Sequence, residues 1–139
     1  MPELRGAWPL RNLVRSAAAW LLIMVLAILN GIFREAVLLP GLGKPVAFLL
    51  SGFLLCLFIL AVAVALARWL QLTSPSRCLT VGALWLGLTL IFEFGFGMVQ
   101  GQSWTEMLQA YTFKDGNIWP LVLVATFVAP LVAARVRMP

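Results

Sequence analysis

Four long apolar runs without a charged residue limit what this chain of 139 residues can fold into. The runs cover 16–33, 45–67, 78–92 and 116–134. With short extensions they predict four spans, near 16–38, 46–69, 79–99 and 117–134. Each span is close to the roughly 20 residues that an α-helix needs to cross about 30 Å of hydrocarbon. The predicted fold class is an all-α membrane protein, with residues 1–139 as a single transmembrane domain of four helices in one bundle.

The composition agrees with a chain that lies mostly in lipid. Hydrophobic residues make up 63% of the sequence and charged residues 11%, against about 25% charged in an average soluble domain. A water-soluble domain of this size buries too small a share of its surface to hide so many apolar side chains. The first run follows several arginines, as in a signal peptide, but it is long for one and no small-x-small cleavage site precedes Arg34. We therefore expect the first helix to be retained.

The basic residues predict the orientation of the chain. Cytoplasmic loops of membrane proteins carry an excess of lysine and arginine. If the four spans are correct, one side holds seven arginines and the other holds Lys44 and Lys114, which predicts that both termini are cytoplasmic. The seven are Arg5, Arg11, Arg15, Arg68, Arg77, Arg135 and Arg137. Because the basic residues are scattered at the ends of apolar runs and form no solvated stripe, the net charge of +5 does not indicate nucleic-acid binding.

The connection between the third and fourth spans contains a helix signal. Ser103 and Glu106 have the Ser-x-x-Glu spacing of a capping box, which predicts a short helix over about 103–112. Its apolar residues share one face, so we expect it to lie in the outer membrane interface. Trp104, Tyr111 and Trp119 would then form an aromatic belt, or alternatively a wall of a binding site.

Three charged residues fall inside the predicted spans: Arg34, Glu35 and Glu93. A charge near the centre of a bilayer costs roughly 2.5–3.5 kcal/mol on insertion scales, so such residues usually face the protein interior and pair with one another. With the predicted orientation all three lie in the outer third of the membrane. We expect Arg34 to pair with Glu93 across the first and third helices. Glu35 would complete a triad around the guanidinium or extend towards the interface.

Small and polar residues share faces with these charges. Helices in lipid associate through such residues, so these faces are expected to point into the bundle. Asn30 precedes Arg34 by one helical turn, and Thr89 precedes Glu93 in the same way. The candidate binding residues are Asn30, Arg34, Glu35, Thr89, Glu93, Trp104 and Tyr111. Two interpretations stay open at this point: the cluster locks the register of the bundle, or it forms a polar site that opens outward.

Several kinds of chemistry lack the residues that they need. The sequence has no histidine, which excludes histidine-dependent triads and haem ligation through histidine, and no phosphate loop, Cys-x-x-Cys or Gly-x-Ser-x-Gly motif is present. Asp115 is the sole aspartate. Cys56 and Cys78 fall at different predicted depths, so a disulfide between them is not expected. We predict no catalytic residue, no metal and no cofactor.

Three short motifs resemble those of a family of small bacterial four-helix integral membrane proteins whose activity is uncharacterised. The motifs are Asn30-Gly31-x-x-Arg34-Glu35, Phe92-Glu93-Phe94-Gly95-Phe96-Gly97 and Gly101-x-Ser103-Trp104, followed by Tyr111. The resemblance covers most of 27–134 and implies a four-helix fold in the bacterial inner membrane. Members of that family often carry histidine where this chain has Met98, which argues against acid–base chemistry there.

Three function classes follow from these observations. The first is a binding or transport protein whose polar cluster contacts a small polar molecule, an ion or a lipid headgroup. The second is a structural or accessory subunit that binds another membrane protein, with the cluster as a packing lock. The third is a lipid-modifying enzyme. This class has the least support, because no nucleophile or metal site accompanies the carboxylates. Expected partners are membrane lipid and a second copy of the chain or another membrane protein.

Overall fold

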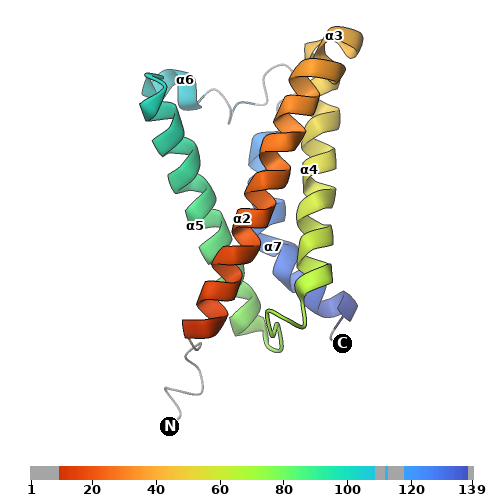
Figure 1. The fold of residues 1–139 in the computed structure, drawn as a ribbon, viewed down its shortest axis with the longest axis vertical. Helices are drawn as coiled ribbons and strands as arrows, with labels where there is room; N and C mark the ends of the chain where they lie inside the picture. Colours follow the sequence, from red (N-terminus) through yellow and green to blue (C-terminus); the bar gives the residue numbers. More distant parts are fainter. Residues whose placement is uncertain (1–9, 109–111, 113–117, 138–139) are drawn as a thin grey trace.

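The computed structural model describes residues 10–108, 112 and 118–137. Its helices are α2 (Leu10–Phe33), α4 (Lys44–Leu66), α5 (Pro75–Val99), the short α6 (Trp104–Leu108) and α7 (Trp119–Arg137). A π-helix, η1 (Arg34–Leu38), and one turn of helix, α3 (Leu39–Leu42), continue α2 without a break. Four of these segments are long and apolar enough to cross a membrane. The predicted fold class is confirmed, and the structure is that of a multi-pass membrane protein (Figure 1).

The first helix is longer than the sequence predicts. The first span was predicted to end near 38, but the helical path runs through Pro40 and ends at Gly43, whose φ of 83° reverses the chain. Pro40 lies in the last turn of this continuous helical path, where its missing N–H removes one backbone hydrogen bond without ending the helix. The whole segment from Leu10 to Leu42 has 33 residues, about 50 Å of helix at 1.5 Å per residue. It therefore exceeds the roughly 30 Å of a hydrocarbon core.

The third helix also begins earlier than predicted. The side chain of Ser74 accepts a hydrogen bond of 3.2 Å from the backbone N–H of Arg77 and so caps α5. Pro75 follows as the first helical residue, which is the arrangement that a helix start favours. The sequence Ser74-Pro75 thus starts the helix four residues before the predicted boundary at 79.

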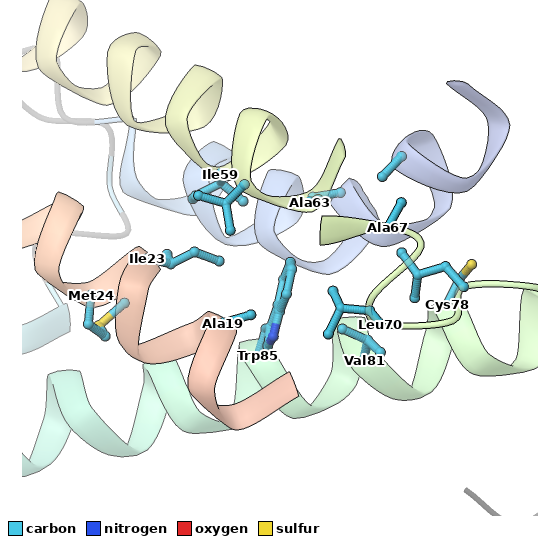
Figure 2. Packing of buried hydrophobic residues seen from close by; sticks show 14 of the residues in the cluster. Ala19, Ile23, Met24, Ile59, Ala63, Ala67, Leu70, Cys78, Val81 and Trp85 are labelled. Carbon is cyan, nitrogen blue, oxygen red and sulfur yellow. The ribbon is translucent and has the colours of Figure 1, made fainter. Parts of the chain in front are cut away.

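The long helices form a ring in which α2 and α7 each pack against both α4 and α5. Alanine and branched side chains around Trp85 fill the centre of this ring (Figure 2). The backbones of α5 and α7 approach closely at Gly82, where a Cβ atom would lie 2.2 Å from the carbonyl oxygen of Phe127. This contact requires glycine, in agreement with small-residue packing between membrane helices.

Two tryptophans join α2 to α5 in the half of the bundle that lies away from α6. Trp85 Nε1 donates to the backbone oxygen of Ser16 at 2.9 Å, and Trp20 Nε1 donates to Thr89 Oγ1 at 3.0 Å. Beyond these bonds α5 diverges from α2 and α4 towards the end of the bundle that carries α6 (Figure 1). The bundle is therefore tightly closed at one end and splayed at the other.

The short helix α6 begins as predicted. The backbone N–H of Ser103 donates to Glu106 Oε1 at 2.9 Å, and the N–H of Glu106 donates to Ser103 Oγ at 3.2 Å, which completes the capping box. These hydrogen bonds lower the pKa of the Glu106 carboxyl. Met107 is buried against the end of α5, where its Sδ would lie 2.6 Å from a Cβ at Gly97. The rest of the predicted extent, 109–111, lies outside the described residues.

Candidate functional site

A cavity of about 450 Å³ lies in the splayed half of the bundle. All four long helices contribute to its wall, together with residues that follow α5 and precede α7. Its volume falls within the range of about 300–1,000 Å³ that is usual for ligand pockets. The polar side chains in the wall are Asn30, Arg34, Ser51, Thr89, Glu93, Gln100 and Gln102. Four of the predicted binding residues, Asn30, Arg34, Thr89 and Glu93, thus line one space.

Asn30 supplies a buried hydrogen-bond donor that has no acceptor among the described residues. Its side chain lies on the side of α2 that faces α4 and is 4% exposed. Its Oδ1 accepts a hydrogen bond from the hydroxyl of Ser51, while its Nδ2 has no partner. A buried polar group left without a hydrogen bond costs about 1–3 kcal/mol. Asn30 therefore places a buried, unsatisfied N–H group in a residue of the cavity wall, at a cost in stability.

Arg34 lies at the point where α2 changes to a π-helix. Its Cζ is 4.8 Å from the centroid of the Phe48 ring on α4, which is a cation–π distance. Its Nη2 would lie 3.8 Å from a Cβ at Gly31, so the guanidinium folds back along α2 towards Asn30. Single π turns within α-helices occur frequently at functional sites. Here the π-helix begins at the residue that brings a positive charge to the cavity.

The predicted pair between Arg34 and Glu93 is wrong. The ion pair that Arg34 forms within the described chain is with Glu35, at 3.6 Å between Nε and Oε2. Glu93 instead accepts a hydrogen bond of 2.7 Å from Trp119 Nε1 on α7. The two residues remain on different walls of the cavity because α5 leans away from α2 at this level (Figure 1).

Thr89 closes the inner end of the cavity. Its hydroxyl accepts from Trp20 and donates to the backbone oxygen of Trp85 at 2.7 Å. The side chain is 4% exposed; the hydrogen bond that it accepts joins α2 to α5, and the one that it donates lies within α5. Its position in the wall matches the predicted site, while its hydrogen bonds are those of a structural residue.

The remaining predicted residues do not line the cavity. The Glu35 side chain is 59% exposed and reaches Arg34 from outside the cavity wall. Trp104 is exposed, and its ring centroid lies 5.7 Å from that of Phe94. Tyr111 lies outside the described residues.

Sequence reasoning missed Ser51 and Phe48 as parts of this site. Ser51 is a lone hydroxyl within an apolar run, which is a signal of an interhelical hydrogen bond in membranes. Trp119 was expected in an aromatic belt or, alternatively, in the wall of a binding site; it lines the cavity, and its indole N–H donates to a carboxylate. Phe48 carries no sequence signal, since its contact with Arg34 depends on how α2 and α4 pack.

Within the described residues, no group of three or more histidine, cysteine, aspartate or glutamate side chains could hold a metal ion. No protein-family model, curated protein or solved structure matches this chain. The resemblance to small bacterial four-helix membrane proteins therefore stays a prediction. Any function must be argued from the cavity itself.

Proposed function

We propose that this protein is a ligand-binding protein of the bacterial inner membrane and that it holds the polar group of its ligand in the cavity between the four helices. The observation that carries this proposal is the unpartnered Nδ2 of Asn30, buried in the cavity wall beside Arg34. An acceptor atom of a ligand at this position would satisfy the donor and recover the free energy that the empty site loses.

The charges around the cavity favour a dipolar ligand. Arg34, which is paired with the exposed Glu35 and lies 4.8 Å from the Phe48 centroid, places guanidinium N–H donors in the α2–α4 wall, where they can bind an anionic group. Glu93 on α5 supplies a negative charge to the opposite wall. A ligand with a negative and a positive group would be complementary to both walls.

The ion pair in the structure gives little support to the alternative that the charges lock the bundle. Arg34 and Glu35 are consecutive residues, so their ion pair ties no helix to another. A largely exposed pair of this kind contributes about 0–1 kcal/mol. Uncharged contacts join the helices at the closed end, through the hydrogen bonds of Trp20 and Trp85 and the close approach at Gly82. Arg34 and Glu93 reach neighbouring helices through the rings of Phe48 and Trp119, and neither contact is an ion pair between helices.

The excess of arginine near the helix ends opposite the cavity supports a cytoplasmic location for both termini. The cavity end, with Arg34 and α6, would then face the periplasm. Fusion of a periplasm-active or cytoplasm-active reporter to the C-terminus tests this orientation. We expect activity from the cytoplasmic reporter, and activity from the periplasmic reporter would reverse the assignment.

Native mass spectrometry of the full chain, extracted from its own membrane in mild detergent, tests the binding proposal. We expect a bound small molecule on the wild type that is lost from Arg34→Gln. Arg15→Gln is the matched control, because Arg15 also stacks on an aromatic ring, 5.2 Å from the Trp69 centroid, but at the opposite end of α2. A bound species retained equally by both variants, or no bound species on the wild type, contradicts the proposal.

A further inference from the structure

The cavity has an apolar edge that faces outward from the bundle. Ile28, Phe92 and Phe96 all line it, and they are 52%, 39% and 51% exposed. A side chain that both lines a cavity and is exposed lies at its rim. These three residues belong to helices that are long and apolar enough to cross a membrane, so we infer that this rim faces hydrocarbon.

The positions of these residues show where the rim lies. The rings of Trp20 and Phe92 are in edge contact with centroids 6.2 Å apart, and Phe96 stacks on Phe92 at 5.8 Å. Phe92 and Phe96 therefore continue the edge of α5 that faces α2, beyond the last hydrogen bond between the two helices. Ile28 lies two helical turns beyond Trp20 on α2. These contacts, with the exposure of the three side chains, indicate a lateral opening of the cavity between α2 and α5.

We propose that the ligand is a membrane phospholipid whose headgroup carries a phosphate and an amine, and that it enters sideways through this opening. The inference rests on the proposed binding function and names its ligand. The phosphate lies towards Arg34 and the free Nδ2 of Asn30, and the amine lies towards Glu93. The acyl chains leave between Ile28 and the two phenylalanines into the surrounding bilayer.

The chemistry of the two parts of the opening supports a lipid over a water-soluble dipolar molecule. Arginine and amide N–H groups are strong donors to phosphate oxygens. The acyl chains of a phospholipid reach through about half of the roughly 30 Å hydrocarbon core, which is too long for them to be contained in this cavity. They need an apolar exit, and the rim at Phe92 and Phe96 provides one. A water-soluble ligand would make no use of it.

Native mass spectrometry with defined probes tests the inference on the lipid-stripped full chain. The probes are phosphatidylethanolamine, phosphatidylglycerol and the soluble headgroup phosphorylethanolamine. We expect phosphatidylethanolamine to bind most tightly. Arg34→Gln should weaken the affinity for phosphatidylethanolamine by about 10–100-fold, which corresponds to the loss of one charge-assisted hydrogen bond. Equal binding of phosphatidylglycerol would overturn the assignment of the amine to Glu93.

A variant of the rim separates the lipid from a soluble ligand. Phe96→Ala should weaken phosphatidylethanolamine by about 2–10-fold, the range for one aromatic contact, and leave the affinity of phosphorylethanolamine unchanged. Phe53→Ala is the control, because Phe53 is 61% exposed on α4 and does not line the cavity. It should change neither affinity.

The possible failures are distinguishable. If phosphorylethanolamine binds as tightly as the lipid, and Phe96→Ala has no effect, the lateral entry of a lipid is wrong while the binding cavity stands. The same conclusion follows if a ligand other than a lipid is lost with Arg34→Gln. If no ligand depends on Arg34, the proposed function itself is wrong.

Discussion

Replacing Asn30 by leucine together with Ser51 by alanine separates a functional role of Asn30 from a structural one. The double variant removes the unpartnered Nδ2 and also both partners of the Ser51–Asn30 hydrogen bond. Removing a buried unsatisfied donor should return about 1–3 kcal/mol. Losing one interhelical hydrogen bond in a membrane protein should cost about 0.6–1.5 kcal/mol. The cavity has room for the larger leucine side chain.

We therefore expect the free energy of unfolding of the lipid-stripped double variant to exceed that of the wild type by about 0–2 kcal/mol. It should at the same time lose the bound ligand. The assay is equilibrium unfolding by titration with SDS in mixed micelles, followed by far-ultraviolet circular dichroism. Ligand retention is measured separately by native mass spectrometry, on both proteins extracted from their own membrane without lipid stripping.

Thr89→Val is the matched control for this experiment. Thr89 lines the same cavity but is fully hydrogen-bonded, and its loss leaves the indole N–H of Trp20 without an acceptor. We expect it to destabilise the protein by about 1–3 kcal/mol. If the double variant at Asn30 and Ser51 is destabilised as much as Thr89→Val and still retains the ligand, Asn30 is a structural residue and the reasoning is refuted.

Two further substitutions test the fold. Gly82→Ala should destabilise the bundle by about 1–3 kcal/mol, because the added Cβ would lie 2.2 Å from the backbone of Phe127. Gly87→Ala is the control and should not destabilise it, since a Cβ at Gly87 has no atom within 4 Å. Equal stabilities of the two variants in SDS titration would contradict this packing. The pKa of Glu106 is lowered from 4.5, so its capping bond is present above that pH and is lost as the pH falls through the lower folded value. Hydrogen exchange of the Ser103 amide should therefore accelerate at low pH relative to Glu106→Gln, which keeps the cap without titrating, and identical profiles would disprove the coupling.

The helices could be predicted from the sequence because a membrane-spanning helix needs about 20 consecutive apolar residues, and such runs are visible in the sequence. Runs without a charge gave the four spans, and the spacing of Ser103 and Glu106 gave the start of α6. The boundaries were less accurate near two prolines. The first helix continues through Pro40, past the predicted end at 38, and the third begins at Pro75, a residue type favoured at a helix start, before the predicted boundary at 79.

The candidate site could be predicted in part. Helical spacing placed Asn30 with Arg34 and Thr89 with Glu93, and the structure brings all four to one cavity. The partner of each charge could not be derived, because it depends on the angle between α2 and α5. Attraction of opposite charges predicted a direct pair, whereas the splay of α5 leaves a cavity between them (Figure 1).

Solid-state NMR of the full chain in phosphatidylethanolamine bilayers tests the central claim most directly. The measurement is the dipolar coupling between lipid phosphorus and the side-chain nitrogens of labelled asparagine. Asn12 serves as an internal control, because it is buried at the opposite end of α2 and donates to Gln71. We predict a coupling at Asn30 Nδ2 and none at Asn12. No coupling at Asn30, or equal coupling at both, would contradict the account.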